Sequence, residues 1–232
     1  MVFVVAEIGV NWDGDFALAR DMMKNAKEAG CNAVKFQAFM ENMIKDHPER
    51  TRLMNSTITK ANIETINELS KSVGIEWFCT PMYPAAVDML DHFVKRFKIR
   101  VADSQSLLEN KTSELIERVL KTNKETFVSS QISPRGTRYF NHSQIKWLYC
   151  VPKYPCSLTD LNFRNMKDFD GFSNHCTHFL APLASAILGA KIIEIHITSD
   201  KSKNFIDNNV SFDYAELKNC LKIIRLSEQI IR

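Results

Sequence analysis

Short runs rich in β-branched and aromatic residues alternate with helical patterns from one end of this chain to the other. Such alternation is typical of strand–helix–strand units, whose strands run parallel in one sheet. The predicted strands span residues 2–9, 33–39, 75–80, 97–102, 126–132, 145–151, 171–175 and 192–198. Eight strands joined by crossovers predict an α/β fold in which the sheet closes on itself, a (β/α)8 TIM barrel.

Most of the stretches between these strands carry a helical pattern. One helix is expected to begin at Asp15 and to end at Gly30, since an aspartate caps a first turn and a glycine ends a last turn. Residues 133–144 contain Pro134 and Gly136 and show no helical face, so we expect the fifth helix to be truncated or missing. The other predicted helices span residues 61–73, 84–95, 113–122, 180–188 and 214–231, with a short one possible within 161–169.

The length of the chain suits one domain. It has 232 residues, of which 45% are hydrophobic, and a barrel of this kind typically needs ~250 residues. We therefore expect residues 1–232 to form a single TIM-barrel domain, with no room for a second domain of any size.

Charge and cysteine usage exclude several classes of function. Lys and Arg number 30 against 27 Asp and Glu, and no basic run stands out, so no nucleic acid partner is expected. The six cysteines form no CxxC pair and indicate reduced thiols in a cytoplasmic protein. The N-terminal run has no basic segment before it, and no apolar stretch reaches transmembrane length, so we expect neither a signal peptide nor a membrane partner.

Polar residues occupy strands that should be buried on both faces. In the eighth strand Glu194, His196 and Thr198 share one face and three isoleucines share the other, because side chains alternate along a strand. Other strands show the same feature in Glu7, in Lys35 with Gln37, and in Ser173 with His175. Buried charges need partners, and polar groups of a barrel usually meet at its C-terminal mouth. The sequence therefore predicts a site at that mouth rather than scattered core polar groups.

The residue types at this mouth suggest three kinds of contact. His175 and His196 lie on adjacent strands and could share one divalent metal ion. Lys35 and Lys98 would suit a phosphate or carboxylate, and Glu7 and Glu194 are candidates for sugar hydroxyls or for proton transfer. Small hydroxyls could complete the anion site, namely Thr80, Ser129, Ser130 and Ser173. Cys176 faces away from His175 in a regular strand and is expected to pack in the core.

At this point the chain resembles the N-acetylneuraminate (sialic acid) synthase family, in ordered matches over nearly its whole length. The segment AEIGVNWDGD at 6–15, with KFQ at 35–37, is similar to the family's AEIGxNHxG and KFQ. Further matches are CTP at 79–81, FKI at 97–99, YCVPKYPC at 149–156, FSNHCT at 172–177, LGAKIIEIHIT at 188–198, and Asp207 with Ser211.

The resemblance implies a TIM-barrel catalytic domain that condenses phosphoenolpyruvate with an amino-sugar aldehyde such as N-acetylmannosamine. It implies that His175 and His196 hold the metal, Mn²⁺ or Mg²⁺. Lys35, Thr80, Lys98, Ser129 and Ser173 would bind phosphoenolpyruvate. Gln37, Tyr154 and Asp207 would bind the sugar, and Glu7 and Glu194 would be catalytic residues that also face it.

Several positions differ from the family pattern, namely Trp12, Val101, Pro152, Asn174, Cys176, Ile195 and Asn208. The C-terminal antifreeze-like domain, which in the family covers a partner's sugar site, is not found within the 232 residues. We therefore expect a sugar site that is open to solvent unless a homodimer or a separate lid protein covers it.

Two other functions stay open at the level of sequence. One is a catalytically lapsed paralogue that binds a phosphorylated ligand or regulates a partner. The other is a different metal-dependent barrel enzyme, such as an aldolase. Release of phosphate from phosphoenolpyruvate in the presence of a sugar separates the synthase from both.

Overall fold

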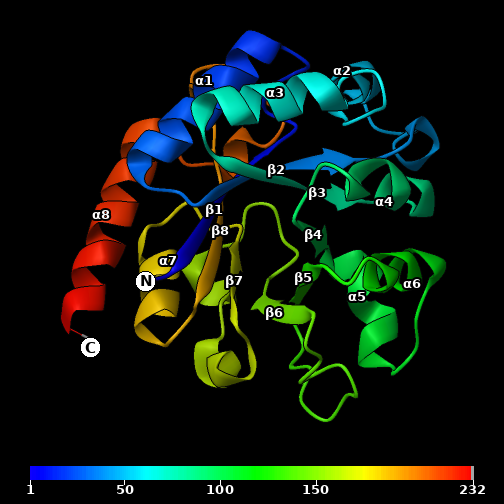
Figure 1. The fold of residues 1–232 in the computed structure, drawn as a ribbon. Helices are drawn as coiled ribbons and strands as arrows, with labels where there is room; N and C mark the ends of the chain where they lie inside the picture. The colour runs from blue at the N-terminus through cyan, green and yellow to red at the C-terminus, as the bar shows by residue number, and fades with distance from the viewer. Residues whose placement is uncertain (231–232) are drawn as a thin grey trace.

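The computed structural model describes residues 1–230, and within them eight parallel strands form a closed barrel in chain order (Figure 1). The barrel closes between the first and last strands, where Glu7 lies opposite His196. The strands are β1 Phe3–Gly9, β2 Ala33–Ala38, β3 Glu76–Pro81, β4 Arg96–Ile99, β5 Glu125–Ser130, β6 Ile145–Tyr149, β7 Gly171–Asn174 and β8 Ile192–His196. The predicted (β/α)8 barrel is confirmed.

Helices pack around the outside of this barrel (Figure 1). Asp15 caps the first helix by accepting hydrogen bonds from the N–H groups of Ala17 and Leu18, and Gly30 ends it with a φ of 100°. The α-helices are α1 Phe16–Ala29, α2 Arg50–Ser56, α3 Ile63–Val73, α4 Pro84–Asp91, α5 Val101–Leu108, α6 Glu114–Lys121, α7 Leu180–Ile187 and α8 Tyr214–Ile230. None of them, in the part of the chain that the structure describes, is long and apolar enough to cross a membrane.

The structure differs from the sequence prediction in a few places. Helix α2 lies in the polar segment 47–59, where no helix was predicted. Strand β4 stops at Ile99 instead of residue 102, because Arg100 turns the chain and α5 begins at Val101. Residues 131–144, all of them described, hold no helix. The helix expected between β5 and β6, the fifth in the barrel's repeat, is therefore missing as predicted, while α5 and α6 both precede β5. Residue 231 of the predicted last helix lies outside the described residues.

Apolar side chains fill the barrel directly below its C-terminal end. Phe78 and Phe127 are fully buried and meet edge to face, with ring centroids 5.6 Å apart. Each lies two residues before a polar side chain of the same strand face, Thr80 and Ser129. At the other end of the barrel the guanidinium of Arg96 stacks on Phe127. An apolar layer thus separates the polar C-terminal end from a charged group at the opposite end.

A close approach of three strands makes Gly171 necessary. Its Cα neighbours are Leu148 on β6 and Ile192 on β8, and a Cβ at this position would lie 2.1 Å from the carbonyl oxygen of Ile192. Backbone cannot move away cheaply inside a closed sheet, so only glycine fits here.

We expect Gly171→Ala to lower the free energy of unfolding by about 3 kcal/mol, since a clash in a packed core forces strands apart. Gly136→Ala is the control, because nothing lies within 4 Å of its Cβ position and its φ of 87° alone should cost about 1–2 kcal/mol. Urea unfolding followed by circular dichroism measures both. Equal costs would show that β7 is not pinned between its neighbours.

Candidate active site

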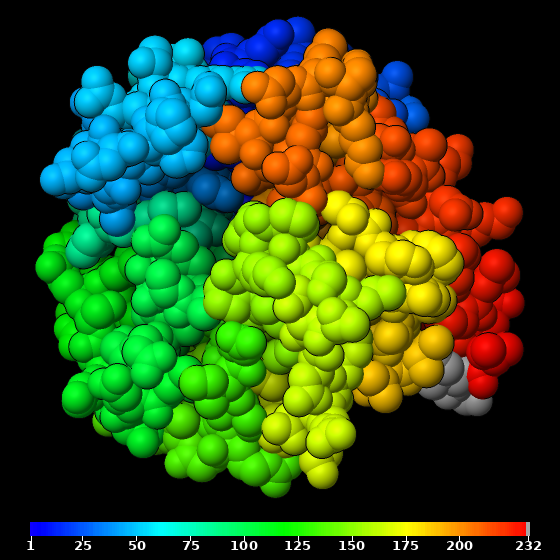
Figure 2. Space-filling view, turned by 180° about the vertical axis from the view of Figure 1, so that it is seen from behind, coloured from blue at the N-terminus to red at the C-terminus, as the bar shows by residue number. Residues whose placement is uncertain are grey.

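A cavity of about 440 Å³ opens at the C-terminal mouth of the barrel. In the space-filling view it is a hollow bordered by the light-blue segment near 40–57, the orange segment near 200–210 and the yellow-green segment near 150–160 (Figure 2). All twelve predicted site residues line it: Glu7, Lys35, Gln37, Thr80, Lys98, Ser129, Tyr154, Ser173, His175, Glu194, His196 and Asp207. Strand alternation therefore located the cavity correctly, while the role of each residue remains a prediction.

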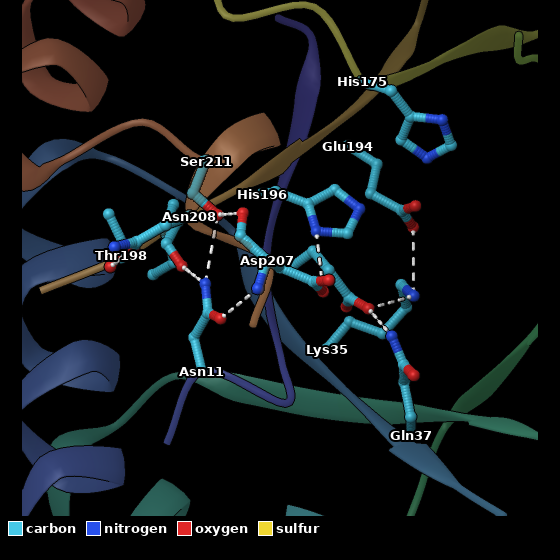
Figure 3. A network of polar contacts seen from close by, with 12 residues as sticks. Asn11, Lys35, Gln37, His175, Glu194, His196, Thr198, Asp207, Asn208 and Ser211 are labelled. Carbon is cyan, nitrogen blue, oxygen red and sulfur yellow. Dashed lines mark hydrogen bonds and ion pairs between the residues drawn. The ribbon is translucent and has the colours of Figure 1, made fainter. Parts of the chain in front are cut away.

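Two carboxylates and two ammonium groups alternate across the floor of the cavity. Lys35 Nζ lies 3.7 Å from Glu194 Oε2 (Figure 3) and 2.9 Å from Glu7 Oε1. Lys98 Nζ lies 2.6 Å from Glu194 Oε1. All four side chains are at most 5% exposed. Hydroxyls complete the network, since Lys35 donates to Thr80 Oγ1 at 3.0 Å and Ser173 donates to Glu194 Oε1 at 2.7 Å.

Burial and charge act differently on the four groups. Burial raises the pKa of Glu7, and the neighbouring Glu194 adds to this while Lys35 opposes it. Burial also opposes the charge of Glu194, but Lys35 and Lys98 together hold its pKa below the usual range. Burial lowers the pKa of Lys98, whereas Glu194 and Glu7 outweigh burial at Lys35 and raise its pKa. Two acids in one cavity thus differ in their readiness to carry a proton.

Four buried polar atoms in this cavity have no hydrogen-bond partner among residues 1–230. They are Glu7 Oε2, Glu194 Oε2, Ser129 Oγ and His196 Nδ1. A buried polar atom without a partner costs about 1–3 kcal/mol, so such atoms seldom gather without a ligand or water to satisfy them. Their concentration at the wall of one cavity indicates a binding site.

The two histidines share one side of the cavity. Their ring centroids are 5.3 Å apart, and the ring of Tyr154 packs on His175 at 4.0 Å. His175 Nδ1 lies 2.8 Å from the carbonyl oxygen of Val151, to which it donates, and this leaves Nε2 as an acceptor or ligand. Burial, with the neighbouring His196, lowers the pKa of His175 to about 3, so its ring is neutral.

This donor set fits a divalent ion. A neutral imidazole is the form that binds a metal, and the carbonyl of Val151 fixes the orientation of His175 as an outer ligand does in metal sites. His196 Nδ1 is buried and makes no hydrogen bond within the described chain. It lies 3.5 Å from Asp207 Oδ2. No group of three His, Cys, Asp or Glu side chains among residues 1–230 is arranged to hold an ion alone. Two imidazoles would thus leave coordination positions for a substrate.

A buried asparagine that had no predicted role holds the Asp207 segment in place. Asn11 is fully buried, accepts a hydrogen bond from the N–H of Asp207 at 2.9 Å and donates to Ser211 Oγ at 3.1 Å (Figure 3). It also donates to the carbonyl oxygen of Ile197 at 2.9 Å. Asn11 therefore ties the end of β8 to the loop that brings Asp207 beside His196. Its place in the AEIGVN segment was the signal available in the sequence.

The structure corrects two smaller predictions and adds one residue that was overlooked. Thr198 does not line the cavity, since it lies beyond the end of β8 and donates to Asn208 Oδ1. Ser130 turns its hydroxyl to the backbone of Ile132 instead of the cavity. Cys150 was overlooked, and its Sγ lies 3.8 Å from His175 Nδ1. Cys176 is buried in the main core, in agreement with a packing role.

The positions that depart from the family pattern divide into two groups. Val101 and Pro152 line the cavity, and Arg100 joins them there. Trp12 does not, since it is fully buried, packs edge to face on Phe36 and donates to the carbonyl oxygen of Ser56 at 2.9 Å. Only the first group borders the cavity directly.

Removal of one carboxylate tests the alternating network. We expect Glu194→Gln to lower the free energy of unfolding by about 3–5 kcal/mol, because it leaves Lys98 buried without a counter-ion. The double variant Glu194→Gln with Lys98→Met should recover much of this loss. Glu68→Gln, which breaks an exposed pair with Lys71, should cost less than about 1 kcal/mol. Urea unfolding of the parent and the three variants gives their free energies of unfolding. If Glu194→Gln were as stable as the parent, the coupling between Glu194 and Lys98 would be contradicted.

Known proteins resemble this chain in sequence and in fold. A sequence model of the NeuB family matches residues 22–232. An uncharacterised protein of Methanocaldococcus jannaschii is 30% identical over 99% of this chain and 72% of its own length. The N,N'-diacetyllegionaminic acid synthase of Legionella pneumophila is 28% identical over 99% of this chain and 73% of its own. The crystal structure of the N-acetylneuraminic acid synthetase of Leptospira borgpetersenii in complex with citrate superposes with a TM-score of 0.86 at 26% identity, over 99% of this chain and 84% of that one.

Proposed function

Because this chain belongs to the NeuB family, we propose that its barrel condenses phosphoenolpyruvate with an amino-sugar aldehyde to give a sialic or other nonulosonic acid and inorganic phosphate. The observation that carries this is the meeting of two lysines, two glutamates and two histidines in one cavity. Two of the relatives, synthases of diacetyllegionaminic and N-acetylneuraminic acid, support the same class of product.

The floor of the cavity suits phosphoenolpyruvate. Lys35 and Lys98 offer charge to its carboxylate and phosphate, and Ser129 Oγ is buried without a partner in the described chain. In the proposed reaction, carbon 3 of phosphoenolpyruvate attacks the aldehyde carbon, water adds at carbon 2, and phosphate leaves. A new carbon–carbon bond forms and the carbon–oxygen bond to phosphate breaks without oxidation or reduction.

The glutamates divide the proton chemistry. Glu7, whose pKa is raised by burial, is suited to give a proton to the oxygen that was the aldehyde. Glu194, whose pKa is held low by two lysines, stays charged and keeps both ammonium groups in position. Gln37 donates to Glu7 Oε1 at 2.8 Å, and Oε2 makes no hydrogen bond within the described chain, so it is free to act on a substrate.

His175 and His196 would hold a divalent ion such as Mn²⁺ or Mg²⁺. When bound there, such an ion supplies Lewis acidity for the aldehyde oxygen. Asp207 and Tyr154 border the same space and are placed to contact the sugar.

A specific observation favours the second candidate, a ligand-binding paralogue without turnover. Val101 and Pro152, which differ from the family pattern, put apolar side chains at the wall of the cavity, so this wall offers fewer polar contacts to a phosphoryl group. Such a protein would bind phosphoenolpyruvate without releasing phosphate.

The decisive experiment incubates the protein with phosphoenolpyruvate, Mn²⁺ and a panel of 2-acetamido aldoses, and measures inorganic phosphate and a 2-keto acid product. Both products should appear together in equal amounts and depend on the sugar. Binding of phosphoenolpyruvate without release of its phosphate, in the presence of every sugar of the panel, would favour the paralogue instead.

We expect Glu7→Gln to lower kcat by about 10²–10⁴-fold, the usual contribution of a positioned proton donor. The amide keeps the shape and a hydrogen-bond acceptor for Lys35, so the KM for phosphoenolpyruvate should change little. Steady-state kinetics on the parent and the variant separate the two effects. A change confined to KM would assign Glu7 to binding alone.

We expect His196→Ala to weaken Mn²⁺ binding at least about tenfold, because one of two imidazole ligands is lost. Titration of the protein followed by the electron paramagnetic resonance signal of free Mn²⁺ measures this without any turnover. His178→Ala, on the exposed segment before α7, is the control. Equal affinity of the parent and His196→Ala for Mn²⁺ would show that the metal binds elsewhere.

A further inference from the structure

A pair of buried cysteines beside the candidate metal site takes no part in the proposed chemistry. Cys156 and Cys176 are 4% and 3% exposed, and both belong to the main core. The family motifs HCxSxYPT and YSDHT, which the segments 149–156 and 172–177 resemble, have threonine at both positions. The chain thus departs from the family pattern twice, each time to cysteine, at two places that the fold brings together.

A backbone hydrogen bond sets these two cysteines opposite each other. The N–H of Cys156 donates to the carbonyl oxygen of His175 at 3.1 Å. In a parallel ladder, a residue bonded in this way lies opposite the residue that follows the acceptor, which here is Cys176. Backbones paired like this lie about 4.7–4.9 Å apart, which is within the Cα–Cα range of about 4.4–6.8 Å that a disulfide requires.

Among titratable neighbours, Cys176 acts most strongly on Cys156. Burial raises the pKa of Cys156 to about 11, and Cys176 is the next cause, ahead of Asp160. Cys176 itself is held in place, because Asn174 accepts a hydrogen bond from its N–H at 3.1 Å and donates one to its carbonyl oxygen at 2.7 Å. One thiol is therefore fixed at the end of β7, and the other approaches it from the loop after β6.

The loop that carries Cys156 gives an oxidant a route to the pair. No helix or strand includes residues 150–157, and they belong to the yellow-green segment that borders the hollow in Figure 2. Residues 152–155 and 157–159 are exposed, so Cys156 is a single buried position between them. Local opening of such a loop costs far less free energy than unfolding of the barrel, and it exposes Cys156 while Cys176 stays in place.

We propose that Cys156 and Cys176 form a dithiol site that a peroxide oxidises to a disulfide. One sulfur attacks hydrogen peroxide, the O–O bond breaks, and a sulfenic acid and one water result. The second sulfur then displaces the sulfenic oxygen as a second water, and the S–S bond forms. Two thiols and one peroxide thus give one disulfide and two waters, and a small thiol reverses the reaction by exchange.

This disulfide would fix the loop against the candidate metal site. Tyr154 lies two residues before Cys156, and its ring packs on the ring of His175 with centroids 4.0 Å apart. His175 directly precedes Cys176, so the new bond would join the two segments that carry these rings. Oxidation therefore holds Tyr154 on His175, and reduction lets the loop move again.

Peptide mapping tests the bond directly. The reduced protein is treated with hydrogen peroxide, its remaining thiols are alkylated, and a tryptic digest is read by mass spectrometry. Trypsin places Cys150, Cys156 and Cys176 on three different peptides, 147–153, 154–164 and 168–191. The second and third peptides should be joined, and dithiothreitol should separate them.

Two other buried cysteines are the control for selective oxidation. Cys31 follows the end of α1, Cys220 lies within α8, and both should be recovered as alkylated thiols. A bond between Cys31 and Cys220 that forms to the same extent would overturn the proposal. So would oxidation of Cys150 in place of the predicted pair, or sulfinic acid at Cys156 without any cross-link.

Two variants show whether the bond locks the loop. Oxidation should raise the Tm of the parent by about 5–10 °C, because a bond between residues 156 and 176 restricts the unfolded chain. It should also slow tryptic cleavage of the native protein after Lys153 about tenfold or more. Cys156→Thr and Cys176→Thr, which restore the family residues, should abolish the cross-link and both effects.

These measurements decide the proposal without any turnover, so their outcome is independent of the proposed function. If either variant fails to fold, the peptide map of the parent still decides the pairing. An oxidised parent with unchanged Tm and unchanged cleavage after Lys153 would overturn the lock.

Discussion

The alternation of charge across the barrel floor is the interaction on which the rest of the site depends. No single one of Glu7, Lys35, Glu194 and Lys98 could be ionised there alone, because each is removed from water. Together they compensate one another and join β1, β2, β4 and β8 at one level of the barrel. The same arrangement leaves one oxygen of each glutamate without a hydrogen bond within the described chain. Stability and binding capacity thus come from the same four side chains.

The sequence predicted this level of the barrel because alternation in a strand is a strong constraint. With Glu194 and His196 separated by one isoleucine, no regular strand could place them on different faces. The prediction was weaker where the constraint ends. Thr198 lies past the end of β8, so alternation no longer governs it, and Arg100 turns the chain into α5 two residues before strand four was expected to end. Helix α2 was missed because its stability comes from contacts with distant residues rather than from its own pattern.

Trp12 shows what such distant contacts do. Its indole N–H binds the carbonyl oxygen of Ser56 at the end of α2, and its ring lies in the main core against Phe36. The helix is thereby attached to the barrel, and it carries Leu53 to the cavity. Trp12 departs from the family pattern, and its sequence position suggests the loss of a site residue. In the structure it makes a structural contact instead. It acts on the cavity only through the segment that it anchors.

Gly9 explains how three polar groups of the cavity can meet so closely. Its φ of 55° is costly for other residues, and a side chain there would lie 3.3 Å or less from Glu7 Oε1, Asp207 Oδ2 and Gln37 Nε2. With no side chain at this position, the three polar groups approach one another, and Val10 and Asn11 follow immediately. Val10 lines the cavity, and Asn11 fixes the loop that carries Asp207. The end of β1 therefore positions both the polar floor of the cavity and the loop beside it.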